Sequence, residues 1–136
     1  MEAQRALEKV EGVTSHTVSV SISLDSKRVY AFVSRPENLP KWAPGLCRSL
    51  RKSRGGWLLE TPDGEVAFRF VAKNKLGVLD HYVGEFYVPF RVVPNAAGSE
   101  VLLTLFRQPG MSARGFAKDI RLVKRDLARL RRVMGR

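Results

Sequence analysis

The segment that most constrains the fold is the C-terminal stretch 112–134, because its apolar residues form one narrow stripe on a long helix. At roughly 100° per residue they fall within an arc of about 80°. They recur at alternating intervals of four and three positions: Phe116, Ile120, Val123, Leu127, Leu130 and Met134. Ser112 is suited to cap the N-terminus, and arginines in the last turns complement the helix dipole. A helix of about 35 Å with one apolar face must pack on another part of the chain, and it is long enough to cross a whole small sheet.

The residues before this helix predict such a sheet. Four apolar residues alternate with serines from position 18 onward, which is typical of a strand with one solvent-facing side: Val18, Val20, Ile22 and Leu24. Residues 26–34 and 37–42 predict two short helices, which are ended by Pro36 and by Pro44-Gly45. The chain therefore enters its sheet with one strand, interrupts it with two helices and then returns to strands.

Apolar segments separated by turn residues make up the chain after Gly45. Gly55-Gly56 and Asp63-Gly64 are typical of hairpin turns, because glycine adopts positive φ at little cost. Strands are expected at 46–53, 57–61, 65–71, 76–83, 87–93 and 100–107. In the last of these, Val101, Leu103 and Leu105 should face the helix. The pattern predicts an α+β fold, with a curved antiparallel sheet of six or seven strands wrapped around the long C-terminal helix.

Length and composition indicate a single globular domain. The 136 residues, of which 44% are apolar and 27% charged, suffice for one core. We expect a loosely ordered N-terminal arm over residues 1–16 and the domain over 17–136. No apolar run approaches the roughly 20 residues of a membrane-spanning helix and the N-terminus has no hydrophobic signal region, so a cytoplasmic protein is expected. The single cysteine, Cys47, excludes an intramolecular disulfide.

Three stretches, residues 29–45, 77–81 and 93–101, resemble the SRPBCC superfamily, whose START-like or helix-grip fold includes polyketide cyclase/dehydrase-like proteins. The resemblance covers residues 17–134 and agrees with the predicted element order. The superfamily has no universal active-site signature. The resemblance therefore implies a cavity between sheet and helix, and a small hydrophobic or aromatic ligand, rather than a particular reaction.

The aromatic residues either line this cavity or fill the core, and the resemblance favours a cavity. The expected ligand-binding residues are Trp42, Phe68, Phe70, His81, Phe90, Arg91, Leu103, Phe116 and Ile120. We expect no cofactor and no metal, because Walker, dinucleotide-binding, metal-ligand and nucleophile-elbow motifs are absent from the sequence.

Asp80-His81 is the strongest candidate for chemistry. Adjacent strand residues point to opposite faces, so we expect His81 to enter the cavity while Asp80 faces outward. With a reference pKa of about 6.5, His81 is the best candidate catalytic residue for a cyclase- or dehydratase-type enzyme, with Arg91 or Tyr82 stabilising an enolate. The favoured alternative is structural: a buried, hydrogen-bonded His81, and a cross-strand pair of Arg91 with Asp80 or Glu100.

Two acids on the C-terminal helix, Asp119 and Asp126, flank the apolar stripe. They either reach the mouth of the cavity or pair with nearby cations, and a pair between Asp126 and Arg129 is favoured.

The net charge of +11 is concentrated on the C-terminal helix. Between Arg114 and Arg136 nine basic residues stand against two acids. This face is either simply solvated or binds an anionic partner such as nucleic acid, the ribosome or an anionic membrane. A monomer and a homodimer are both open, because Leu102 and Phe106 lie on the outer face of the expected sheet.

Overall fold

The computed structural model describes residues 14–135. Eight strands and four helical segments lie in this part of the chain. In chain order they are β1 (Ser15–Ile22), α2 (Ser26–Val33), η1 (Pro36–Asn38), α3 (Leu39–Trp42), β2 (Ser49–Ser53), β3 (Gly56–Thr61), β4 (Gly64–Phe70), β5 (His81–Val83), β6 (Phe86–Val88), β7 (Phe90–Asn95), β8 (Gly98–Phe106) and α4 (Ala113–Val133). The predicted order of one strand, short helices, further strands and one long helix is confirmed. The predicted number of six or seven strands is too low.

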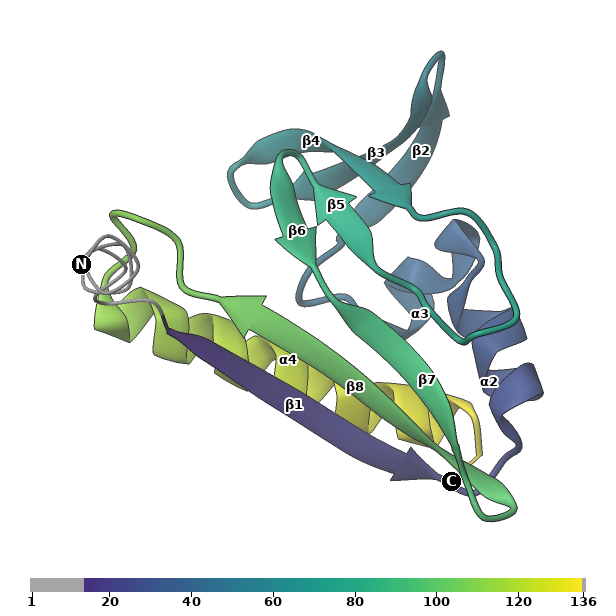
Figure 1. Cartoon of the computed structure of the whole chain (residues 1–136). Helices are drawn as coiled ribbons and strands as arrows, with labels where there is room; N and C mark the ends of the chain where they lie inside the picture. The colour runs from purple at the N-terminus through teal and green to yellow at the C-terminus, as the bar shows by residue number, and fades with distance from the viewer. Residues whose placement is uncertain (1–13, 136) are drawn as a thin grey trace, which may run out of the picture.

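The strands form two antiparallel sheets instead of the single sheet that we expected. One has the order β1-β8-β7 and the other the order β2-β3-β4-β5-β6 (Figure 1). The expected strand 87–93 is divided at Pro89, where β6 ends its pairing with β5 and β7 begins its pairing with β8. Proline has no N–H to donate to a ladder, so the chain changes its hydrogen-bonding partner there. Because one continuous segment serves both sheets, the two sheets meet at β6 and β7.

The two sheets also meet at the segment before β5. The expected strand 76–83 has regular pairing only at β5, but the Leu79 N–H donates to the Phe90 carbonyl at 2.7 Å and the Val92 N–H to the Gly77 carbonyl at 2.9 Å. Gly77 has φ of 74°, and a Cβ there would lie 2.0 Å from the Val92 carbonyl oxygen. Only glycine permits this close approach of two backbones.

The long helix α4 begins and ends within a residue of its predicted bounds. Its N-cap, Ser112, accepts a hydrogen bond from the Gly115 N–H at 2.9 Å. The helix lies along the back of the three-stranded sheet and contacts β1 and α3 (Figure 1). Leu127 and Leu130 of its stripe are fully buried, as is Val101 on the inner face of β8. Leu103 and Leu105 of β8 line the same cavity as Val123 and Leu127 of α4, so the predicted facing of the last strand and the helix stripe is confirmed for these residues.

The short helices close one end of the molecule. Asp25 caps α2 by accepting from the Arg28 N–H at 2.9 Å, and α2 packs Val29 and Val33 against β7 and β8. The first strand, β1, begins at Ser15, two residues before the expected start of the domain. Residues 1–13 of the expected arm lie outside the described part of the chain.

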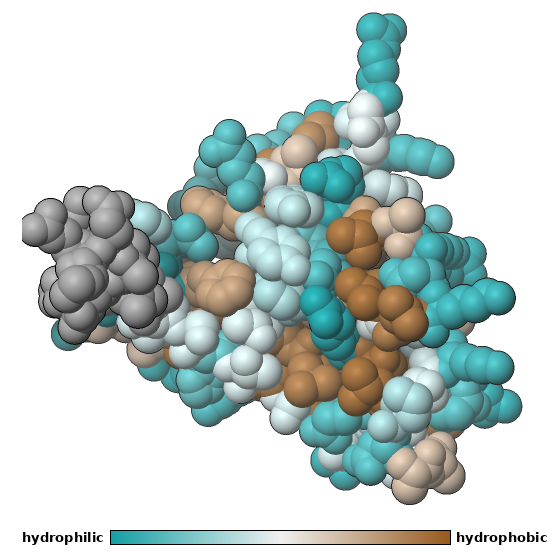
Figure 2. All heavy atoms as spheres, viewed as in Figure 1, coloured by the Kyte–Doolittle hydropathy of each residue, from teal (hydrophilic) through white to brown (hydrophobic). Residues whose placement is uncertain are grey.

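The outer face of the strands carries scattered apolar side chains. Figure 2 shows apolar surface over β7 and over the segment that leads into β5, where Val93 and Leu76 are exposed. Phe106, one of the two residues considered for an interface, stacks on Tyr87 with ring centroids 6.4 Å apart. The oligomeric state stays a prediction. Among the described residues, no helix is both long enough and apolar enough to span a bilayer.

Candidate functional site

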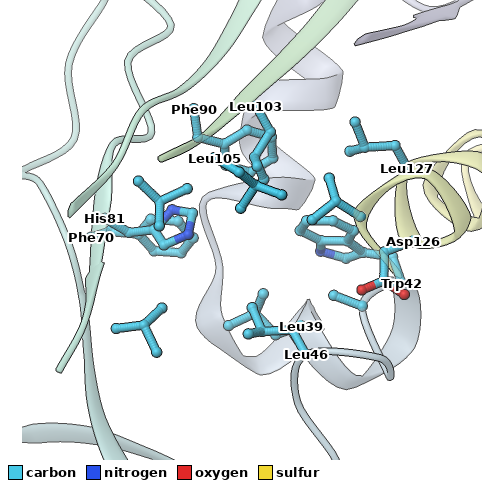
Figure 3. Close-up of a pocket in the computed structure, with 14 residues that line it drawn as sticks. Leu39, Trp42, Leu46, Phe70, His81, Phe90, Leu103, Leu105, Asp126 and Leu127 are labelled. Carbon is cyan, nitrogen blue, oxygen red and sulfur yellow. The ribbon is translucent and has the colours of Figure 1, made fainter. Parts of the chain in front are cut away.

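A cavity of about 80 Å³ lies between the strands, α3 and α4 (Figure 3). Its wall is almost wholly apolar, and the lining residues come from elements far apart in sequence. They are Leu39, Trp42, Ala43 and Leu46 around α3, Phe70, His81, Val83, Val88, Phe90, Leu103 and Leu105 from the strands, and Val123, Asp126 and Leu127 from α4. The lining thus comes from both the strands and the long helix, the two parts of the fold between which the family resemblance implies a cavity.

The lining residues are arranged as facing walls. Figure 3 shows His81 and Phe70 on one side and Trp42 with Asp126 on the other. Four leucines lie between them: Leu39, Leu46, Leu103 and Leu105. Six of the lining residues are only half-buried: Leu46, Phe70, Val83, Val88, Leu105 and Val123. The more accessible part of the lining is therefore mainly aliphatic.

His81 is held in an aromatic cage and is only 4% exposed. Its ring lies 5.1 Å from the ring of Phe68, 5.6 Å from Phe70 and 5.7 Å from Phe90, measured between centroids. Nδ1 is 3.1 Å from the Leu79 carbonyl oxygen, which favours the tautomer with the proton on Nδ1. Burial lowers the pKa of His81 to about 4. At neutral pH it is therefore uncharged, and Nε2 offers a lone pair and no proton.

Asp80 points away from the cavity, as the alternation along a strand requires. Its carboxylate accepts from Arg91 Nε at 2.9 Å, Arg91 Nη2 at 3.0 Å, the Phe90 N–H at 2.9 Å and the Tyr87 hydroxyl. Burial by itself raises the pKa of Asp80, but the hydrogen bonds from Arg91, Tyr87 and Phe90 outweigh it and hold the pKa at about 2. The predicted cross-strand pair of Arg91 with Asp80 is confirmed, and Arg91 lies outside the cavity.

Asp126 also lines the cavity. The sequence left it open whether this residue reaches the cavity or forms an ion pair on the helix surface. It is only 6% exposed, and Oδ1 accepts from the Gly45 N–H at 3.3 Å. Burial raises the pKa of Asp126 to about 6, although the backbone N–H groups of Gly45 and Leu46 partly oppose this rise. Gly45 permits the contact because a Cβ there would lie only 3.1 Å from Oδ1.

The favoured pairing of Asp126 with Arg129 is wrong. Arg129 Nε instead donates to the Lys41 carbonyl at 3.0 Å, and no ion pair of Asp126 occurs among residues 14–135. Because the carboxylate faces inward, the cation one helical turn away cannot follow it without being buried as well.

Trp42 contributes an unpaired donor to the same wall. The residue is 3% exposed and its ring lies 5.8 Å from that of Phe90, yet Nε1 has no hydrogen-bond partner among the described residues. In Figure 3 the ring nitrogen lies on the edge of the indole that is turned towards the cavity. A buried donor without a partner costs about 1–3 kcal/mol, so an acceptor brought close to Nε1 would be bound favourably.

Five of the predicted ligand-binding residues line the cavity: Trp42, Phe70, His81, Phe90 and Leu103. Phe68 lies behind Phe70, with ring centroids 4.9 Å apart. Phe116 and Ile120 belong to the apolar stripe of α4 but do not line the cavity, because they lie one to two turns nearer its N-terminus than Val123 and Leu127. The other aliphatic lining residues, such as Leu39 and Leu127, were missed, since nothing in their local sequence separates cavity from core.

Comparisons with known proteins establish the fold. No protein-family model and no curated protein matches this chain. Among solved structures, the protein XoxI from Bacillus cereus is similar with a TM-score of 0.73 and 18% identity, over 88% of this chain and 94% of that one. Ara h 8.0201 is similar with a TM-score of 0.62 and 12% identity, over 88% and 96% of the two chains.

A third similar structure is the di-domain ARO/CYC BexL from the BE-7585A biosynthetic pathway. The TM-score is 0.64 at 16% identity, and the match covers 88% of this chain but 45% of that one. At such low identities the likeness carries the fold and no activity. The chain therefore shares the helix-grip fold of these structures, in which a long C-terminal helix packs on antiparallel strands, as the resemblance in its sequence implies.

Proposed function

We propose that this START-like domain binds a compact hydrophobic or aromatic molecule in the cavity between its strands and α4. The observation that supports the proposal most directly is an apolar cavity whose wall includes Trp42, because the buried Nε1 donor of this residue has no partner within residues 14–135. Apolar walls with a few convergent polar groups are the usual composition of small-molecule sites. Structural similarity to an ARO/CYC protein is compatible with this function but adds only the fold.

The size of the cavity restricts the guest. Its volume of about 80 Å³ is far below the roughly 300–1,000 Å³ of sites for drug-sized molecules. It is also smaller than the cavity of about 150 Å³ that admits benzene in another protein. A single ring therefore requires lining side chains to move outward, such as those of the half-buried Leu46 and Val123. A polycyclic guest requires a much larger rearrangement.

The polar groups of the walls restrict the chemistry of the guest. Trp42 Nε1 is enclosed, so an acceptor reaches it only if neighbouring side chains move, as they must for a ring to enter. A guest with an acceptor such as a carbonyl oxygen then gains a hydrogen bond. His81 is neutral at pH 7, so it does not attract a charged group. A guest carboxylate would meet the carboxyl group of Asp126 without a neutralising cation in the wall. We therefore favour a neutral aromatic carbonyl compound over a hydrocarbon or an acid.

Catalysis of a cyclase or dehydratase type is the weaker alternative. The residues expected to stabilise an enolate do not line the cavity: Arg91 binds Asp80, and Tyr82 lies under the guanidinium of Arg69, 4.5 Å from ring centroid to Cζ. His81 remains the best catalytic candidate, but its pKa of about 4 makes it a weak base at neutral pH.

A matched pair of guests tests the binding proposal. Toluene and benzaldehyde have similar size, but only benzaldehyde carries an acceptor for Trp42 Nε1. In isothermal titration calorimetry both should bind saturably, and benzaldehyde should bind about 3- to 10-fold more tightly, as one net hydrogen bond allows. Replacing Trp42 by Phe should abolish that difference while leaving toluene binding measurable.

Two controls accompany this experiment. The Trp57→Phe variant should behave like the parent protein, because Trp57 lies in β3 and does not line the cavity. The Leu105→Phe variant should fill the cavity and block both guests, because Leu105 lines it. The proposal fails if neither guest binds to folded protein, or if Leu105→Phe leaves binding of both unchanged.

A further inference from the structure

The face of α4 opposite its apolar stripe carries a continuous row of basic residues. At roughly 100° per residue the row occupies an arc of about 80° centred directly across the helix from the apolar residues. We call it the cationic stripe, and it consists of Arg114, Lys118, Arg121, Arg125, Arg129 and Arg132. All six are exposed, and the helical rise spreads them over about 27 Å. Both acids of α4, Asp119 and Asp126, lie on a flank outside this arc.

The cationic stripe is not neutralised within the described residues. The three ion pairs there join Arg28 to Asp25, Arg51 to Glu65 and Arg91 to Asp80, and none includes a residue of α4. The polar contact of a stripe residue is the hydrogen bond from Arg129 to the Lys41 carbonyl. Like charges three and four positions apart on a helix repel each other, so the stripe is costly unless an anion covers it.

The composition of the stripe suits phosphate. Five of its six cations are arginines, whose planar guanidinium binds phosphate oxygens through two parallel hydrogen bonds. A nucleic-acid duplex presents one negative charge per roughly 1.7 Å of its axis, so a stripe of this length meets many phosphates at once.

The surroundings of the stripe argue against a membrane and against single strands. A helix that binds a bilayer surface inserts its apolar face, but the apolar face of α4 is buried under the strands, with Leu127 and Leu130 at most 1% exposed. Single-stranded nucleic acid is held by aromatic stacking, and the aromatic residue of α4, Phe116, is buried. Contact with the phosphate backbone of a duplex needs neither an exposed apolar face nor an exposed aromatic ring on α4.

From this geometry we propose that the cationic stripe of α4 binds the phosphate backbone of double-stranded nucleic acid, without preference for base sequence. The proposal is independent of any guest in the cavity, because the stripe and the cavity lie on opposite sides of the helix. It names a second binding surface, in addition to the cavity.

Fluorescence anisotropy with a labelled duplex of about 20 base pairs tests the proposal. The stripe variant carries Arg121→Gln, Arg125→Gln and Arg132→Gln. The control variant carries Arg48→Gln, Arg54→Gln and Lys73→Gln, which replace three exposed cations with no ion pair among the described residues. Both variants lose three positive charges, so their net charges are equal. We expect the stripe variant to lose at least about 10-fold in affinity and the control less than about 3-fold. The salt dependence of log K should flatten by about 0.9 for each phosphate that the stripe variant no longer neutralises.

Several outcomes would overturn the proposal. Equal losses in the two variants would show attraction to net charge alone. Equal or tighter binding of single-stranded oligouridine, or binding of anionic phosphatidylserine vesicles without binding of the duplex, would assign the surface to another partner. Circular dichroism of both variants ensures that a lost affinity does not reflect a lost fold.

Discussion

Two buried aspartates show how the surroundings of one side chain decide its chemistry. Asp80 accepts hydrogen bonds from a guanidinium, a hydroxyl and a backbone N–H, and its pKa is held at about 2. The backbone N–H groups of Gly45 and Leu46 and the more distant charges of Arg125 and Arg129 oppose the effect of burial on Asp126, but burial prevails and raises its pKa to about 6. Asp80 ties the segment before β5 to β7 through these hydrogen bonds. Asp126 instead places an ionisable group in the cavity wall.

Replacing Asp126 by Asn should stabilise the protein at neutral pH. The folded state holds the Asp126 proton more tightly than the unfolded chain, so the cost of the ionised form is absent below about pH 3.8 and complete above about pH 6. The variant should therefore gain about 1–3 kcal/mol at pH 7.5 and almost nothing at pH 3.5. Urea unfolding at the two pH values measures this. Asp119→Asn, at a half-buried position, should show a smaller gain of the same sign.

Replacing Asp80 by Asn should have the opposite effect. The amide keeps the size of the side chain but loses the charge that holds Arg91, so unfolding should become easier by about 2–4 kcal/mol at neutral pH. Since the folded pKa is depressed, the difference should disappear as the pH falls from about 3.8 through about 2. Glu65→Gln, which breaks the exposed pair with Arg51, is the control and should leave the urea midpoint nearly unchanged.

At the scale of elements, the joint between the two sheets depends on a change of partners at Pro89 and on the close contact of Gly77 with β7. Alternation of apolar and polar residues predicts strands within each segment, and it does so correctly for β1 and β8. It contains no signal for the residue at which one strand exchanges its neighbour for another. The expected single sheet was wrong for this reason, although the strands that compose it were largely correct.

Two glycine substitutions distinguish the cost of backbone strain from the cost of a steric clash. Gly77 lies at this joint, and Gly84 lies in the turn between β5 and β6. Gly77 and Gly84 both have positive φ, at 74° and 62°, but only at Gly77 would a Cβ collide with a backbone atom. Gly84→Ala should cost about 1–2 kcal/mol from the left-handed conformation alone. Gly77→Ala should cost several kcal/mol or prevent folding, as urea unfolding or far-UV circular dichroism will show. Equal costs would mean that the joint is not rigid.

At the scale of the whole molecule, the net charge of +11 is borne largely by a helix that is essential to the core. The same helix supplies the inner wall of the cavity and the cationic stripe on its outer side. Stability and binding should therefore respond to salt in opposite directions. Screening relieves repulsion within the stripe and weakens its attraction to phosphate.

Raising the ionic strength from about 0.02 M to about 0.3 M should raise the Tm of the free protein by about 2–6 °C. The stripe variant should already have a higher Tm at low salt and should respond less to added salt, because three of its repelling charges are gone. The control variant should keep most of the salt response. Differential scanning calorimetry of the three proteins measures both effects, and an identical salt response in all three would contradict the assignment of the repulsion to α4.

The amino-acid sequence alone determined the two faces of α4, because helical periodicity is a property of a single segment and places Leu127 and Arg125 on opposite sides whatever surrounds them. For the same reason it determined that His81 and Asp80 face opposite ways. Only the tertiary structure decided that Asp126 lies against Gly45, 81 positions earlier in the chain, and how much space the side chains leave between β5 and α4. Such contacts and voids depend on how separate segments pack, which no local pattern records.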